Sequence, residues 1–283
     1  MPAIKRILFP VDFSKRCIGA ARYVEALAGR FEAEVTLLHV VSHGEHTLAS
    51  ELYEKRKNQL DTFLDDELKY YSAKKVCVIG DAAEMIVQTA RSWQADLVMM
   101  PTYGLGRYRR LLLGSTTAKI LHDLECPIWT DVHAEDAPEL EDIACRKILC
   151  AIGMDAIGMD ERSDCSLAWA AYLAEEYQAE LGIVHAVPAV EASAPARFLD
   201  QEFSAYVTAE ARKRILRMLE ARRVTAATFI EAGEPAAVAA DIARNFGADL
   251  LVIGRHAKGG LAGHLRQNAY AILRESPCPV LSV

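Results

Sequence analysis

Residues 5–12 read KRILFPVD, and this stretch returns near the middle of the chain, where residues 146–153 read RKILCAIG. A second stretch is repeated as well: ADLVMM at residues 95–100 returns as ADLLVI at residues 248–253. Both copies end with a Cys-Pro pair that precedes a short apolar run. A repeat that extends over the whole chain indicates that each half forms the same kind of structural unit.

Short apolar runs alternate with longer amphipathic segments in both halves. In the first half, the sequence predicts strands at 4–11, 34–41, 74–79, 95–101 and 127–132, and helices at 18–31, 50–71, 82–93 and 115–124. In the second half, it predicts strands at 146–152, 180–187, 224–231, 248–254 and 279–283, and helices at 163–178, 197–222, 235–246 and 265–275. Strands that alternate with helices are joined by right-handed crossovers into a parallel sheet. We therefore predict an α/β protein of two tandem doubly wound domains.

The boundary between the two domains is predicted from a change in composition. Residues 131–144 read DVHAEDAPELEDIA, a segment that is rich in acidic residues and has no apolar period. We interpret most of it as a linker. The predicted organisation is a first domain at 1–132, an acidic linker at 133–144 and a second domain at 145–283.

Composition and charge narrow the classes of function. The 283 residues are enough for two domains of ordinary size, and the net charge of −7 gives no electrostatic reason to expect nucleic acid as a partner. The seven cysteines form no Cys-x2-Cys pair and lie within apolar segments, which is typical of a reduced, cytoplasmic protein. No apolar run approaches the ~18 residues that a membrane helix needs, so we expect no membrane partner.

Several features of the first half follow strands whose carboxyl ends should meet at one edge of the sheet. In open parallel sheets, ligands bind at that edge, at the point where the strand order reverses. Asp12 follows the first predicted strand, and the fourth runs into residues 101–117, which read PTYGLGRYRRLLLGSTT. Glycines there allow backbone N–H groups to approach a ligand, and Gly114-Ser115 opens a helix whose N-terminus favours an anion. This stretch is therefore predicted to cradle phosphate.

Other interpretations stay open for some of these residues. Asp12 would also serve as a cap for the first helix. The arginines of residues 107–110 either add charge to the cradle or form a solvated face or an interface. His39 lies on an apolar strand and is predicted as a packed core histidine, and no metal site is predicted from it and the histidines that follow.

The two motifs of the first half resemble those of the universal stress protein family, and the resemblance extends over essentially the whole chain in two copies. ATP-binding members carry an Asp after the first strand and the pattern Gly-x2-Gly-x9-Gly-(Ser/Thr) after the fourth. Residues 10–14, PVDFS, match the first motif, and Gly104-x9-Gly114-Ser115 matches the second except at its first glycine, where Pro101 stands. Pro101 lacks an N–H group, so a hydrogen bond donated there is lost. The family implies a five-stranded parallel sheet in the order 3-2-1-4-5 for each domain, with helices on both faces.

The resemblance also implies where an adenine nucleotide lies. Adenine would lie near Val11, Asp12 and the backbone of Val40, and the ribose and phosphates would lie near residues 101–104 and 114–117. The implied cofactor is ATP or AMP, together with Mg²⁺. The residues that the resemblance assigns to nucleotide binding are Pro10, Val11, Asp12, Val40, Met100, Pro101, Thr102, Tyr103, Gly104, Arg107, Gly114, Ser115, Thr116 and Thr117.

The second half does not keep these motifs. The first glycine is present as Gly254, but the second has become Ala257 and the Gly-Ser pair has become Gln267-Asn268. Gly153 stands where the first half has its Asp, or Gly158 does if the short local duplication at residues 152–161 is placed differently. We therefore predict that the second domain does not bind ATP in the family's usual way.

Together these features predict a cytoplasmic stress-response or regulatory protein that binds ATP or AMP in its first domain. The second domain is expected to be a structural partner, with the halves packed as an intramolecular pseudo-dimer. A further homodimer and the protein partner stay open. No P-loop, nucleophile elbow or His-Glu-x2-His motif occurs, so no catalytic residue is predicted. Two alternatives remain, a slow ATPase or nucleotidyl-handling enzyme, and an interaction scaffold that binds no nucleotide.

Overall fold

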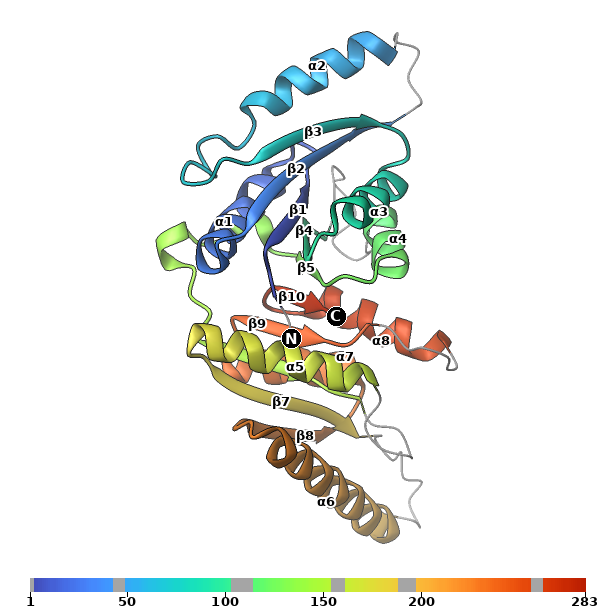
Figure 1. Ribbon diagram of the computed structural model, residues 1–283. Coiled ribbons are helices and arrows are strands. Elements are labelled where there is room, and N and C mark those ends of the chain that lie inside the picture. The colour runs from blue at the N-terminus through green and yellow to red at the C-terminus, as the bar shows by residue number, and fades with distance from the viewer. Residues whose placement is uncertain (1–2, 43–48, 103–113, 154–160, 188–196, 256–261) are drawn as a thin grey trace. The chain divides into compact units, whose positions relative to one another are not determined.

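The computed structural model describes residues 3–42, 49–102, 114–153, 161–187, 197–255 and 262–283. Its contacts divide the chain into two compact units, Ala3–Ala144 and Cys145–Val283. Each unit is a parallel sheet with helices packed on its faces (Figure 1).

The first unit has the strand order β3-β2-β1-β4-β5, and each of these neighbours pairs in parallel. This order confirms the predicted doubly wound fold. Right-handed crossovers place α1 and α2 on one face of the sheet and α3 and α4 on the other. The elements are β1 (Arg6–Pro10), α1 (Lys15–Phe31), β2 (Glu34–Val41), α2 (Ala49–Thr62), β3 (Lys74–Ile79), α3 (Ala82–Trp93), β4 (Leu97–Pro101), α4 (Ser115–Asp123) and β5 (Ile128–Asp131).

The second unit repeats this architecture, with the strand order β8-β7-β6-β9-β10 in parallel. Among the helices that the structure describes, none is long and apolar enough to cross a membrane. The elements are β6 (Lys147–Ala151), α5 (Glu161–Tyr177), β7 (Glu180–Val187), α6 (Arg197–Arg222), β8 (Ala227–Ala232), α7 (Pro235–Phe246), β9 (Leu250–Ile253), α8 (Ala262–Glu275) and β10 (Val280–Ser282).

Capping residues explain where α3 of the first unit and α7 of the second unit begin. The side chain of Asp81 accepts from the backbone N–H of Glu84 and caps α3. In the second unit, Glu234 caps α7 in the same way, and Pro235 at the first helical position has the backbone angle that a helix needs. Gly247 then ends α7 in the left-handed conformation at φ 70°.

The predicted helix at 50–71 is wrong in its second part. α2 ends at Thr62, and the chain continues in turns because Leu64 adopts a left-handed backbone angle, φ 63°. Leu60, Leu64 and Leu68 are all buried, so their four-residue spacing in the sequence looks like a continuing helix. The N–H of Leu68 donates to the carbonyl of Leu64 at 2.9 Å, which gives one isolated helical turn.

The segment expected to be an acidic linker belongs to the first unit and packs on α1. It contains two short 3-10 helices, η1 (Ala134–Asp136) and η2 (Leu140–Asp142). Arg16 of α1 forms an ion pair with Glu135 at 2.9 Å. Gly19 lies so close to the backbone of η1 that a Cβ atom there would be 1.6 Å from the carbonyl oxygen of Ala134. A glycine in α1 therefore admits this segment.

Candidate functional site

The strand order of the first unit reverses at β1, whose neighbours are β2 and β4. The carboxyl edge next to this strand is therefore the switch point at which doubly wound sheets bind ligands. Of the residues assigned to nucleotide binding, Tyr103, Gly104 and Arg107 lie outside the described residues. The other eleven lie at strand ends on this edge, directly after those strands, or in the start of α4: Pro10, Val11, Asp12, Val40, Met100, Pro101, Thr102, Gly114, Ser115, Thr116 and Thr117.

The two strands at the switch point pair for only part of their length. β1 and β4 pair through Ile7 with Leu97 and through Leu8 with Val98, and no further pair follows between these described strands. Beyond this point β1 continues to pair with β2, and β4 with β5. The hydrogen-bonded ladder between the two central strands therefore ends before their carboxyl ends, at the predicted site, where Pro10 and Pro101 have no N–H to donate.

Asp12 shapes the turn between β1 and α1. Its Oδ1 accepts from the backbone N–H of Ser14 at 3.0 Å and from the thiol of Cys17 at 3.1 Å. Ser14 occupies the N-cap position of α1, and its own side chain makes no capping bond. The bond from the N–H of Ser14 to Asp12 closes the turn before the helix and does not cap the N–H groups of its first turn. Both bonds use Oδ1, and Oδ2 takes no part in them. Burial, and then the Asp12 carboxylate, raise the pKa of Cys17 to about 12.

Both backbone groups of Val11 are engaged. Its N–H donates to the carbonyl of Leu38 at 2.9 Å, and its carbonyl lies 2.8 Å from Nδ1 of His39. A base at this position would therefore find no free N–H on Val11, while the carbonyl keeps a second lone pair. His39 is buried, and this burial lowers the pKa of its ring. It is the packed histidine that its apolar strand indicates.

Phe13 lies beside this group, and sequence reasoning gave it no role. It has a left-handed backbone angle, φ 62°, which is uncommon for a bulky residue. Its ring lies 4.3 Å from the ring of His39 and 5.0 Å from that of Phe63, centre to centre. The guanidinium of Arg56 lies 5.6 Å from the centre of the Phe13 ring. No local signal marks this arrangement, because α2 and the turns after it supply two of the partners.

The start of α4 has the properties of an anion site. Gly114 is the N-cap residue, so no side chain caps the helix, and its first turn carries no acidic residue. The free N–H groups and the dipole of a helix N-terminus favour an anion. Thr117 donates from Oγ1 to the carbonyl of Thr102 at 3.2 Å, which ties this turn to the end of β4. Thr102 is fully buried, and its own Oγ1 has no partner among the described residues.

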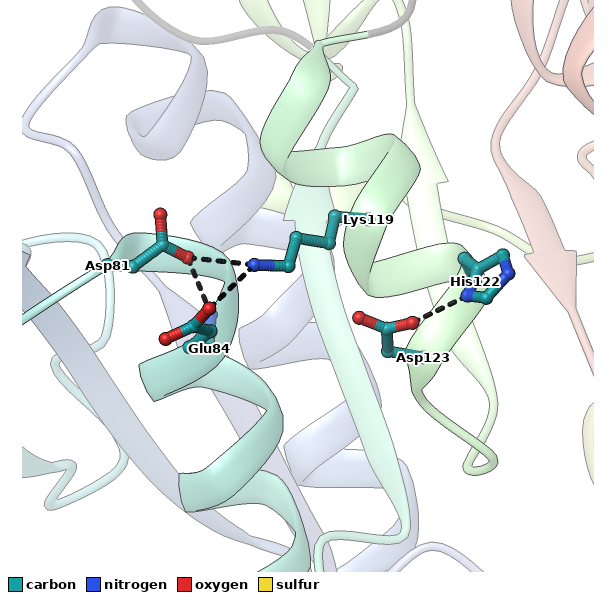
Figure 2. Close-up of polar contacts among 5 residues, drawn as sticks. All are labelled: Asp81, Glu84, Lys119, His122 and Asp123. Atoms are coloured by element: carbon teal, nitrogen blue, oxygen red, sulfur yellow. Dashed lines mark hydrogen bonds and ion pairs between the residues drawn. The ribbon is translucent and has the colours of Figure 1, made fainter.

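Side chains on the outer face hold α4 against α3. The ammonium of Lys119 lies 3.0 Å from Glu84 and 3.4 Å from Asp81, the residue that caps α3 (Figure 2). Arg91 of α3 donates to the backbone carbonyl of Asp123 at the end of α4, at 2.7 Å. Exposed ion pairs contribute little stability individually. Together these contacts connect α3 and α4 along their exposed sides.

The corresponding part of the second unit differs in two ways and agrees in a third. β6 and β9 pair along four residues, as far as Ala151 with Ile253. α8 begins at Ala262, so Gln267-Asn268 lies inside the helix, whereas Gly114-Ser115 lies at the start of α4. His185 keeps the contact of its counterpart, because its Nδ1 lies 2.9 Å from the carbonyl of Ile152. The contact between the buried histidine and a backbone carbonyl is thus common to both units. The length of the central ladder and the position of the helix start are not.

Comparisons with known proteins agree with this architecture. The model of the universal stress protein family matches the chain twice, at residues 3–130 and 145–283. Universal stress protein MJ0577 of Methanocaldococcus jannaschii is 26% identical over 149 residues, which cover 44% of this chain and 92% of that protein. Universal stress protein MJ0531 of the same organism is 28% identical over 135 residues, which cover 44% of this chain and 79% of that protein.

A solved structure has the same fold over nearly the full length. The crystal structure of a universal stress protein from Archaeoglobus fulgidus superimposes with a TM-score of 0.74 at 18% identity, and the match covers 98% of this chain and 97% of that one. The double family match accounts for both repeats that the sequence contains. The chain therefore belongs to the universal stress protein family, as a tandem member with two family domains.

Proposed function

We propose that the first unit binds an adenine nucleotide, ATP or AMP, at the carboxyl edge between β1 and β4. One observation carries the proposal: the ladder between these strands ends early, and the uncapped N-terminus of α4 is tied by Thr117 to Thr102 at the end of β4. A switch point beside an uncapped helix N-terminus suits a ligand with an apolar base and an anionic tail.

The residues around this edge have distinct roles in the proposal. The N–H groups at the start of α4 receive the phosphates, and Ser115 and Thr116 add hydroxyl donors. Asp12 accepts from the ribose or the base through Oδ2. Bound Mg²⁺ neutralises phosphate charge and is held mainly by the phosphates themselves. Fully buried Thr102, whose Oγ1 has no partner among the described residues, offers a donor at the same edge.

The proposal extends to the whole chain. The second unit acts as a structural partner in an intramolecular pseudo-dimer, and nucleotide binding to the first unit changes the surface that a protein partner recognises in the cytoplasm. Separately expressed units, Ala3–Ala144 and Cys145–Val283, should associate when mixed. Gel filtration in which the two units elute independently would remove the pseudo-dimer from the proposal.

The first experiment asks which nucleotide the purified full-length protein contains. The protein is denatured by heat, released nucleotide is identified by chromatography and mass spectrometry, and titration calorimetry with Mg-ATP and with AMP then measures affinity. We expect a single equivalent of nucleotide per chain. Release of ADP or AMP from a sample loaded with ATP would favour the slow ATPase.

Gly114→Val is the test variant, and Gly254→Val, which adds the same side chain to the second unit, is its control. A Cβ atom at Gly114 would lie 3.5 Å from the carbonyl oxygen of Thr102 and 3.6 Å from Oγ1 of Thr117, which is ordinary contact, so the fold should tolerate a side chain there. The larger side chain should obstruct the phosphates and weaken binding about tenfold or more, while the change in the second unit leaves binding intact.

If the unmodified protein contains no nucleotide and binds none, the scaffold function remains. The engaged N–H of Val11 and the missing N–H of Pro101 favour that function.

A further inference from the structure

We propose that Cys17 is a positioning residue of the nucleotide site. Its thiol donates to Oδ1 of Asp12 and thereby directs the other carboxylate oxygen, Oδ2, to the ligand. The hydrogen bond of the thiol is a claim about the turn alone. The claim that this bond serves nucleotide binding rests on the proposed function.

The turn after β1 holds one oxygen of Asp12 with two donors. The backbone N–H of Ser14 donates to Oδ1 at 3.0 Å, and the thiol of Cys17 donates to the same oxygen at 3.1 Å. A carboxylate oxygen has two lone pairs, so these two bonds occupy the acceptor capacity of Oδ1. A group of a ligand that donates to Asp12 must therefore use Oδ2.

The thiol is itself held by a hydrogen bond. Oγ of Ser14 donates to Sγ of Cys17 at 3.7 Å, and the thiol passes its own single hydrogen to Asp12. The N–H of Ser14 completes the arrangement, since it donates to the same carboxylate. Three neighbouring side chains and one backbone group thus form a closed set of bonds around one carboxylate oxygen.

Burial separates the carboxylate from the groups that hold it. Asp12 is half-buried, whereas Ser14 and Cys17 are buried, and the exposed fraction of Cys17 is only 1%. A ligand can therefore contact Asp12 but not the thiol. Any effect of Cys17 on binding must act through the orientation of Asp12, which is the property of a positioning residue.

The thiol remains a donor at neutral pH. Burial, and then the negative charge of Asp12, raise the pKa of Cys17 to about 12. A thiolate would have no hydrogen to donate and would repel the carboxylate. A protonated, buried thiol is also a poor nucleophile, so this environment suits a hydrogen bond and not redox chemistry.

The backbone of Phe13 gives the turn its shape. Phe13 lies between Asp12 and Ser14 and has the left-handed angle φ 62°. Its ring contacts His39 and Phe63, and these contacts help to hold an angle that a bulky residue seldom adopts. The acceptor is thus oriented before a ligand arrives, which reduces the entropy lost on binding.

A double-mutant cycle in the full chain tests this role: Cys17→Ala, Asp12→Ala and the double variant. Titration calorimetry measures the affinity for Mg-ATP. Cys17→Ala should weaken binding about tenfold, because a hydrogen bond to a charged group is lost. In the Asp12→Ala background the same change should have no effect. An equal loss in both backgrounds would assign the effect to general packing and overturn the inference.

A conservative variant and a control in the second unit complete the cycle. Cys17→Ser keeps a hydrogen-bond donor and should bind Mg-ATP within about twofold of the unmodified protein. Cys150→Ala removes an equally buried thiol from the second unit, so it should lower stability toward urea and leave the affinity unchanged. A Cys17→Ser affinity as low as that of Cys17→Ala would contradict the role of the donor.

Infrared spectroscopy decides the hydrogen bond without any nucleotide. The S–H stretching band of Cys17 is the band that disappears in Cys17→Ser. In Asp12→Ala this band should move to higher frequency, because the thiol loses its charged acceptor. A band that does not move would overturn the claim that the thiol donates to Asp12.

These measurements also separate the inference from the proposed function. If the unmodified protein binds Mg-ATP and Cys17→Ala binds it equally well, the role of Cys17 fails and the proposed function stands. If the unmodified protein binds no nucleotide, the proposed function fails together with the role in binding, while the infrared band still decides the hydrogen bond.

Discussion

Oγ1 of Thr117 donates to the carbonyl oxygen of Thr102 at 3.2 Å, and this bond joins the first turn of α4 to the end of β4. The same carbonyl also receives the N–H of Gly114 at 3.4 Å. The helix N-terminus that is proposed to bind phosphate is therefore held by backbone and side chain together.

Thr117→Val should loosen this connection without changing the volume of the buried side chain. We expect a loss of about 1 kcal/mol in the free energy of unfolding, the usual contribution of one hydrogen bond, and weaker binding of Mg-ATP. Urea unfolding and titration calorimetry measure the two effects. Thr116→Val, at a half-exposed position of the same turn, is the control for stability. Nucleotide affinity that is equal in Thr117→Val and the unmodified protein would separate this bond from ligand binding.

Substitutions of Asp12 should separate its structural role from its charge. An Asn in its place keeps an oxygen that can accept from the N–H of Ser14, so Asp12→Asn should unfold at nearly the same urea concentration as the unmodified protein. Asp12→Ala removes the acceptor and should cost about 1 kcal/mol. Both variants should bind nucleotide more weakly. If only Asp12→Ala weakens binding, the carboxylate acts through the turn and not through the ligand.

The buried histidines should make stability depend on pH. Burial lowers the pKa of His39 and of His185 below the ordinary value of 6.5. The folded state therefore holds these rings neutral, while the unfolded chain takes up protons below about that pH. Stability is fully present above 6.5 and is lost as pH falls toward the folded-state pKa values.

His39→Asn should make this loss of stability shallower, because Asn does not titrate and its amide can donate to Val11 in place of Nδ1. Denaturant unfolding at several pH values between neutral and mildly acidic measures the slope. His185→Asn tests the equivalent ring, which contacts Ile152 in the second unit, and should produce a similar change. A slope that neither substitution alters would assign the acid sensitivity to other groups.

Gly19→Ala should detach the segment that packs on α1. The added Cβ would lie 1.6 Å from a backbone oxygen of Ala134, which cannot move aside alone, so we expect a loss of about 1–3 kcal/mol. Gly29→Ala on the same helix is the matched control, since its Cβ would meet the side chain of Tyr71, whose hydroxyl lies 2.6 Å away at the end of a side chain that can rotate. Urea unfolding of both variants measures the difference. Equal stability of the two variants would show that the segment adapts freely.

Much of the fold could be predicted because its signals are local. The prediction of β2 and β3 is confirmed at both ends. α3 begins as expected because Asp81 caps it, and it ends as expected at Trp93, after which Gln94 adopts a left-handed backbone angle. Apolar spacing gave a wrong prediction after Thr62, where residues at helical spacing are buried without forming a helix. Leu60, Leu64 and Leu68 keep helical spacing and are buried, yet the left-handed Leu64 belongs to a turn.

The candidate site was only partly accessible to such reasoning. The Asp after the first strand and the glycine before α4 were found by their position in a motif, and both lie at the switch point. Sequence reasoning did not find three other features of the site. These are the two hydrogen bonds that Asp12 accepts from Ser14 and Cys17, the engaged N–H of Val11 and the position of the Phe13 ring. Each of these depends on a partner from another element, or on a backbone angle that residue type does not prescribe.

By itself the sequence determined that the chain contains two copies of one parallel α/β unit, and that the second copy has lost residues that the first keeps. Repeats, apolar periods and glycines are read along the chain. Only the tertiary structure decided that the N–H of Val11 is engaged by the carbonyl of Leu38 on the neighbouring strand β2. The physical reason is that the side to which a backbone group points is set by which strands become neighbours, and that is a property of the folded sheet.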